Sequence, residues 1–212
     1  LPFGGVIHFE HFSYIVTILW YLGCMNAINF LDGHDGLASG ACLFLGITIT
    51  IVSLQTSNYL ATVLMVAFSG AVLGFLFFNF PPAKIFLGDS GSLLLGFLVA
   101  SLSLVGATMK AQDAVALLVP IVALGLPFFD TGMAILRRWY ARVPISTADR
   151  GHIHHVLLSM GYSPRRVVLI LYGITVILCA AALLITASRN EIAVLVIALL
   201  VIMAFVSVRI FS

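Results

Sequence analysis

The chain has 212 residues, of which 62% are hydrophobic and only 8% are charged, and its formal net charge is +2. A soluble domain carries about 25% charged residues, so a mean hydropathy of +1.18 excludes an ordinary soluble protein. Continuous apolar runs of about 20 residues, rather than alternating strands of about 10, predict an all-α polytopic membrane helix bundle. We expect the lipid bilayer as a partner and no nucleic acid.

Seven segments are apolar and long enough to span a hydrocarbon core of about 30 Å at a rise of 1.5 Å per residue. They are 13–31, 37–55, 59–80, 91–109, 115–136, 167–187 and 191–211. Helices are required because backbone polar groups in lipid must be satisfied within their own segment. We therefore predict seven transmembrane helices in a single domain that covers residues 1–212.

Lysine and arginine predict the orientation of these helices. Two basic residues, Lys110 and Arg189, fall on one side of the predicted bundle. The other eight fall on the opposite side: Lys84, Arg137, Arg138, Arg142, Arg150, Arg165, Arg166 and Arg209. Because cytoplasmic loops are enriched in such residues, the second side is predicted to be cytoplasmic. The first residue is Leu1 and no signal-peptide pattern follows, so we expect the C-terminal part of a longer protein.

A first polar stretch, NAINFLDGHDGLASG, interrupts the apolar pattern at the cytoplasmic end of segment 13–31. It places polar side chains at a spacing of three residues: Asn26, Asn29, Asp32 and Asp35. Ionisable groups at a membrane boundary are costly, which favours a functional site. We expect Gly33 and Gly36 to break the helix and let a ligand approach the backbone. The alternative, asparagines that hold helices together, is favoured for Asn26.

A second stretch, NFPPAKIFLGDSGS, separates segments 59–80 and 91–109. Its two prolines should end one helix, and Asp89 or Ser90 is expected to cap the start of the next. A helix start with free N–H groups suits a phosphate, and a neighbouring carboxylate suits Mg²⁺. A capped loop without a ligand is the alternative, and Lys84 by itself is typical of a lysine at the membrane interface.

The third stretch is DRGHIHH, which begins at Asp149 in the long loop after segment 115–136. Its imidazoles and Arg150 could bind an anion, whereas zinc would require further cysteine or histidine ligands. A solvated basic loop remains an alternative. The three cysteines lie in apolar segments, and we expect them to be buried without a disulfide.

Three motifs together resemble the polyprenyl-phosphate N-acetylhexosamine-1-phosphate transferase family, also called glycosyltransferase family 4. They are NFLDGHDG at Asn29 to Gly36, FLGDSGS at Phe86 to Ser92, and HIHH at His152 to His155. The HIHH form is similar to the bacterial branch that makes undecaprenyl-diphospho-N-acetylglucosamine. The relatives that transfer phospho-N-acetylmuramoyl-pentapeptide look more like HHH in this loop.

The resemblance implies transfer of a sugar-1-phosphate, most simply N-acetylglucosamine-1-phosphate, from a UDP-sugar to undecaprenyl phosphate with release of UMP. It implies that Asp89 binds Mg²⁺, for which Mn²⁺ could substitute, that Asp35 contacts uracil and that Phe86 stacks on it. The nucleotide pocket would also include Asn29, Asp32 and Asn79. The implied diphosphate ligands are Arg150, His152, His154 and His155. The implied catalytic residues are Asp32, Asp35, Asp89, His152, His154 and His155. Asp130 belongs to a PFFD segment also found in the family.

Two departures from the family pattern leave alternatives open. An apolar residue is usual where His34 stands, and an upstream aspartate pair of the family has no counterpart in this chain. Family members of this kind have eleven spans, so we expect four upstream spans and little activity from residues 1–212 alone. The alternative is a non-catalytic paralogue or subunit that keeps the nucleotide pocket. A transporter would instead carry charges near mid-membrane.

The resemblance places the protein in the bacterial cell (inner) membrane with its site facing the cytoplasm, at the start of cell-envelope glycan synthesis. The sequence leaves open which UDP-sugar it uses, which polymer follows, and whether the protein forms a homodimer.

Overall fold

A computed structural model of the chain describes residues 12–107, 121–140, 142 and 153–187. These residues form α-helices joined by turns, and no β-strand occurs among them, which confirms the all-α prediction. The helices are α1 (Phe12–Leu31), α2 (Leu37–Gln55), α3 (Tyr59–Asn79), α4 (Gly88–Ala107), α6 (Gly125–Tyr140), α7 (Ile153–Ser159) and α8 (Pro164–Ala187). Five of them, α1 to α4 and α8, are long and apolar enough to cross a membrane, as expected of a multi-pass membrane protein.

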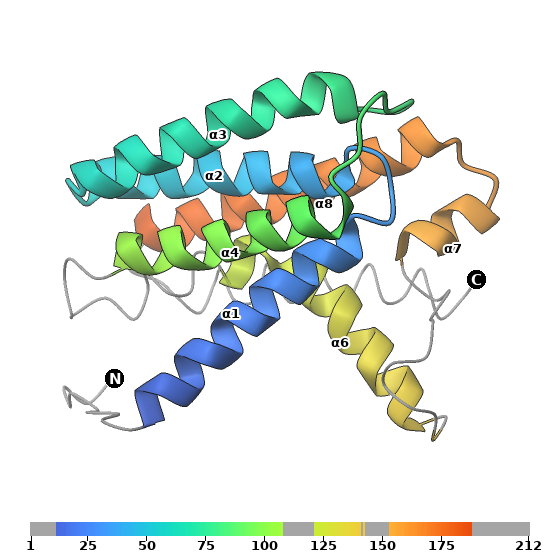
Figure 1. The fold of residues 1–212 in the computed structure, drawn as a ribbon, viewed down its shortest axis with the longest axis horizontal. Helices are drawn as coiled ribbons and strands as arrows, with labels where there is room; N and C mark the ends of the chain where they lie inside the picture. Colours follow the sequence, from blue (N-terminus) through green and yellow to red (C-terminus); the bar gives the residue numbers. More distant parts are fainter. Residues whose placement is uncertain (1–11, 108–120, 141, 143–152, 188–212) are drawn as a thin grey trace.

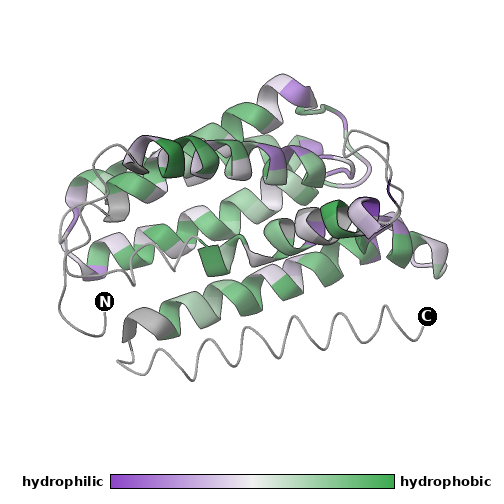
Figure 2. Cartoon of the chain, turned by 90° about the horizontal axis from the view of Figure 1, so that it is seen from below, coloured by the Kyte–Doolittle hydropathy of each residue, from purple (hydrophilic) through white to green (hydrophobic). Residues whose placement is uncertain are grey.

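Helix α2 lies at the centre of the bundle. It packs against α3 on one side and α8 on another, while α4 packs chiefly on α1 (Figure 1). In its membrane-spanning window 72% of α2 is buried, against 22% for α1 and α3. The helices are hydrophobic along most of their length, as Figure 2 shows by colour. The exposed apolar surface of the outer helices is therefore the surface that faces lipid or another membrane segment.

The buried core is formed by side chains of α2 and of the helices that pack around it. Its largest fully buried side chains include Ile28, Leu37, Leu45, Met65 and Leu171, which come from four helices, α1, α2, α3 and α8. Buried hydroxyl groups on these helices, such as Thr48, donate to carbonyls one turn earlier and so need no partner from another helix. Such back-bonding lets the core accept small polar residues at positions like Thr48.

The turns at the helix ends have local causes in the sequence. Gly36 precedes α2 with a φ of 75°, a conformation that costs glycine little and other residues more. Asn58 caps α3, because its side chain accepts a hydrogen bond from the N–H of Ala61 at 3.2 Å. Pro164 opens α8, where the missing N–H of proline breaks no helical hydrogen bond.

The predicted helix bounds agree closely at some segments and differ at others. Segment 37–55 coincides with α2, and α1 and α3 differ from prediction by one residue at one end. Helix α4 begins at Gly88 rather than at residue 91, so Asp89 lies in its first turn and is not the cap. The predicted continuous helix 115–136 is wrong in its described part, because a turn at Leu124 precedes α6. Residues 115–120 and segment 191–211 lie outside the described residues.

Candidate functional site

The polar stretches predicted to share one face do meet at one end of the bundle. The turn after α1, the loop between α3 and α4, the start of α4 and the short helix α7 all lie at this end (Figure 1). Their hydrogen bonds include two at Gly36, with residues 43 and 136 positions away in the sequence. Helices of nearly equal length that run side by side bring alternate chain ends together, and this is how the site is assembled.

An asparagine of α1 connects the first two motifs. The amide Nδ2 of Asn29 donates to Oδ1 of Asp89 at 3.2 Å and to Oγ of Ser92 at 2.8 Å. Ser92 is fully buried, whereas Asp89 is exposed in the first turn of α4. One oxygen of the Asp89 carboxylate is thus held by α1 while the group stays open to a ligand. Gly88, with a φ of 60°, leads into this turn.

Asn79 holds the turn after α1 against the end of α3. Its Oδ1 accepts from the N–H of Gly36 at 3.0 Å and from Oγ of Ser39 at 2.8 Å. Its Nδ2 donates to the carbonyl of Ile85 at 3.0 Å. The hydroxyl of Tyr172 on α8 donates to the carbonyl of Gly36. Asn79 is only 2% exposed, so in this structure it holds the backbone around the site and is not itself on the surface.

The loop between α3 and α4 is fastened to its neighbours by polar groups. Oδ2 of Asp35 accepts from the N–H of Ala83 at 3.0 Å. The Nε of Arg165, at the start of α8, donates to the carbonyl of Pro81 at 2.8 Å. These two bonds hold Pro81 and Ala83 in the loop that carries Phe86, which is 72% exposed. An exposed aromatic ring is able to stack on a flat heterocyclic base.

The carboxylates at this end influence one another. The pKa of Asp32 is raised to about 6. Partial burial is the largest cause, and the negative charges of Asp89 and Asp35 contribute to the same rise. Three carboxylates from two motifs therefore share one electrostatic environment. Such mutual repulsion is relieved by a bound cation or by a proton.

We expect Asp32→Asn to stabilise the protein at pH 8 while it lowers activity. A folded-state pKa above the unfolded value means that the ionised carboxylate costs stability once the pH exceeds about 6, and that this cost disappears toward pH 4. After allowance for partial exposure, removing the charge should raise the unfolding midpoint by about 2–4 °C at pH 8. This rise is measured by thermal unfolding of the purified wild type and variant between pH 5 and 8. Asp32→Glu keeps the charge and should give no rise; an equal rise for both variants would contradict this explanation.

The histidine segment forms part of α7, which packs on α8 and reaches the turn after α1. Oδ1 of the buried Asp130 on α6 accepts from the N–H of Ile153 at 3.1 Å, where α7 begins. His154 is 2% exposed, while His155 is exposed. Asp130 therefore holds the first residue of α7, a role that the sequence did not predict.

Some predicted residues are not joined to this cluster by the structure, and some contributors were missed. Asp149, Arg150 and His152 lie outside the described residues. Asn26 is exposed and donates to the carbonyl of Leu22 in its own helix at 2.7 Å. The residues missed by sequence reasoning are Ser39, Ser92, Arg165 and Tyr172. Ser92 carried a signal because it ends the motif FLGDSGS, and Ser39 because it lies in the first polar stretch.

The donor set at this end fits a magnesium ion that a substrate phosphate would help to hold. Among the described residues no group of three or more histidine, cysteine, aspartate or glutamate side chains could hold a metal by itself. Mg²⁺ commonly uses one or two carboxylates together with substrate phosphates, rather than a cage made only of protein groups. Asp89, exposed and with one oxygen oriented by Asn29, is such a carboxylate.

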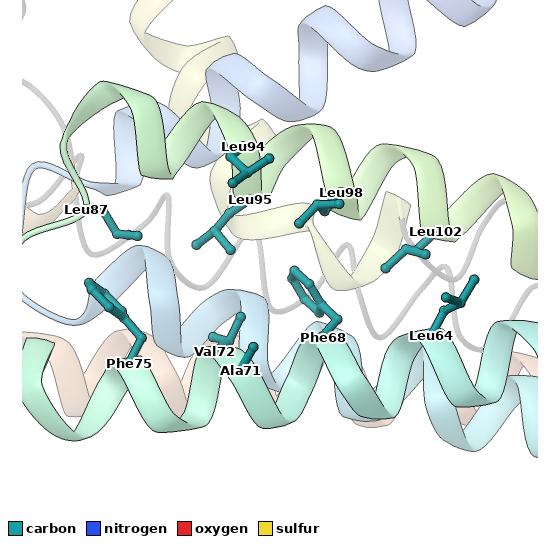
Figure 3. A pocket seen from close by; sticks show the side chains of 10 residues that line it. All are labelled: Leu64, Phe68, Ala71, Val72, Phe75, Leu87, Leu94, Leu95, Leu98 and Leu102. Atoms are coloured by element: carbon teal, nitrogen blue, oxygen red, sulfur yellow. The ribbon is translucent and has the colours of Figure 1, made fainter.

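A separate cavity of about 400 Å³ lies between α3 and α4. Its lining is aliphatic and aromatic, with Phe68 and Phe75 from α3 facing Leu95 and Leu98 from α4 (Figure 3). Its lining offers no polar or titratable side chain for a nucleotide or a metal ion. The candidate site is therefore the polar end of the bundle and not this cavity.

The amino-acid sequence of the chain is similar to known proteins of one family. Residues 1–107 match the model of glycosyl transferase family 4. The chain is 41% identical over 190 residues to a Bacillus subtilis protein described as a probable undecaprenyl-phosphate N-acetylglucosaminyl 1-phosphate transferase, covering 90% of this chain and 53% of that one. It is 38% identical over 193 residues to a decaprenyl-phosphate N-acetylglucosaminephosphotransferase of Mycobacterium tuberculosis, covering 81% and 48%.

A phospho-N-acetylmuramoyl-pentapeptide-transferase of Clostridium beijerinckii is also similar, at 34% identity over 163 residues that cover 76% of this chain and 48% of that one. The chain thus spans about half the length of the curated relatives it matches. The family match begins at residue 1 and includes both aspartate motifs. The chain belongs to glycosyl transferase family 4.

Proposed function

We propose that the protein transfers N-acetylglucosamine-1-phosphate from UDP-N-acetylglucosamine to undecaprenyl phosphate and releases UMP. An oxygen of the lipid phosphate attacks the sugar-linked phosphorus, the bond from that phosphorus to UMP breaks, and a lipid-linked sugar diphosphate remains. The observation that carries the proposal is the bond between Asn29 and Asp89, which joins two motifs at a shared carboxylate site. The names of the relatives support the sugar and the lipid acceptor.

The chain's own residues suit positioning and charge compensation, which are the main demands of phosphoryl transfer. We assign Asp35 and the exposed ring of Phe86 to the uracil, and Asn29 and Asp32 to the nucleotide pocket. The first turn of an α-helix leaves N–H groups without helical partners, so the start of α4 is suited to bind a phosphate. Asn79 shapes this pocket through its bonds to Gly36 and Ile85.

Asp89 is the residue that we assign to Mg²⁺, with Mn²⁺ as a substitute of similar preference for oxygen ligands. When bound, the ion would neutralise charge on the diphosphate. The histidine segment supplies His154 and the exposed His155, together with Arg150 and His152 from outside the described residues, for the sugar diphosphate. We further propose that this end faces the cytoplasm of a bacterial inner membrane, because most basic residues lie on that side.

The proposal is tested by following UMP release in detergent from the complete gene product, with undecaprenyl phosphate as acceptor and Mg²⁺ present. We expect UMP with UDP-N-acetylglucosamine and at least about tenfold less with UDP-N-acetylmuramoyl-pentapeptide, since a site built around one sugar loses contacts with another. A preference for the muramoyl donor would contradict the proposed sugar and favour the activity named for the phospho-N-acetylmuramoyl-pentapeptide-transferase. Absence of UMP with any UDP-sugar would favour a non-catalytic protein.

A further inference from the structure

Three imidazole rings lie in contact with one another in a row that begins at the turn after α1. The rings of His34 and His154 are stacked, with centroids 5.5 Å apart and planes inclined by 24°. The centroid of the His155 ring lies 4.3 Å from that of His154, and the two planes are inclined by 43°. The stacked pair and the neighbouring His155 therefore connect the turn that carries Asp32 and Asp35 with the exposed imidazole of α7, although His34 and His154 are 120 positions apart in the sequence.

His34 contributes to this stack through its ring face. Its Nε2 is buried and makes no hydrogen bond within the described part of the chain. The contact that the structure gives His34 is the ring face that it presents to His154.

Helix α7 depends on contacts of this kind because it is too short to be stable alone. It has seven residues, whereas isolated helices shorter than about 12 residues are marginal in water. Asp130 holds its first N–H, and the ring of His154 lies so close to Gly33 that a Cβ there would be 3.3 Å from Nε2. His34 supplies the aromatic face of the same contact, next to Gly33 in the chain.

We propose that His34 is a positioning residue: by stacking on His154 it sets the place of His155 relative to the carboxylates of the turn. This rests on the proposed function, in which His155 contacts the diphosphate of the nucleotide sugar. The substrate-facing geometry of the histidine segment is then determined jointly by α7 and by the turn after α1. Loss of the ring displaces His155, and the effect falls on nucleotide-sugar binding.

The test compares His34→Leu, which removes the ring, with His34→Phe, which keeps a ring and removes both nitrogens. An aromatic contact of this kind corresponds to about a threefold to tenfold effect, so we expect the KM for UDP-N-acetylglucosamine to rise by that factor in His34→Leu. His34→Phe should restore KM to within about twofold of wild type. Amide hydrogen exchange across residues 153–159 should accelerate in the leucine variant and stay near wild type in the phenylalanine variant.

Two controls make the result specific. Phe97→Leu removes an aromatic contact with Tyr21 (centroids 5.3 Å apart) in the middle of α4 and should leave KM unchanged. In a His155→Ala background the His34→Leu substitution should have little further effect on KM, because both act on one group. Equal impairment of the leucine and phenylalanine variants, or additive effects with His155→Ala, would overturn the proposal. If the wild type releases no UMP, the proposed function fails, and the exchange experiment still decides whether His34 orders α7.

Discussion

Asp89→Asn is expected to lower the rate of UMP release by at least about a thousandfold while the protein remains in the membrane at its normal level. Asparagine keeps an Oδ1 that can accept from Asn29, so the packing of α1 on α4 should persist. Asparagine lacks the negative charge that would hold a cation. Without the cation, the charge that develops on the diphosphate would not be neutralised. More UDP-sugar should not restore the rate, because the missing interaction is strongest in the transition state.

Purified wild type and variant are compared in the UMP assay at saturating donor, with Mg²⁺ as the only divalent ion. Ser90→Ala is the matched control, since Ser90 is exposed in the same turn of α4 and should keep wild-type turnover. Near-normal turnover in Asp89→Asn would exclude this residue as the metal ligand. A loss of equal size in Ser90→Ala would point to disruption of the helix start rather than loss of a charge.

Gly96→Ala is expected to destabilise the protein by about 2–3 kcal/mol and to lower its unfolding midpoint by about 5–10 °C. A Cβ at this position would lie 2.5 Å from Cα of Met25 and 2.9 Å from the carbonyl oxygen of Cys24. Both atoms belong to the backbone of α1, which cannot move aside without separating α1 from α4. The same separation would pull Asn29 away from Asp89, so activity should fall as well.

Gly74→Ala provides the matched comparison for this effect. Gly74 lies inside α3, and a Cβ built there meets no atom within 4 Å. Alanine is favoured over glycine in a helix by up to about 1 kcal/mol, so the midpoint should stay constant or rise slightly. The measurement is the thermal unfolding of purified protein in detergent. Equal midpoints for the two variants would show that α1 and α4 are not held at the close distance on which the site depends.

Most helix positions follow from the sequence alone. A chain that is 62% hydrophobic must satisfy its backbone within helices in lipid, and breaks can then occur only where glycine, proline or clustered polar residues interrupt the run. That is why α2 coincides with its predicted segment and why the turn at Gly36 appears where expected. The interruption at Leu124 was missed because segment 115–136 was judged by its hydropathy, although Gly125 and Pro127 follow directly and are typical helix breakers.

The sequence by itself determined the class of protein, the family motifs and the end of the bundle at which the polar groups collect. Only the tertiary structure decided their partners: that Asn29 binds Asp89, that Asn79 is buried and holds the backbone at Gly36, and that His34 stacks on His154. The physical reason is that hydropathy and helix period place a residue along its own helix, whereas hydrogen bonds and ring contacts depend on how neighbouring helices approach. That approach is set by local steric detail, such as the absence of a Cβ at Gly96 where α1 crosses α4.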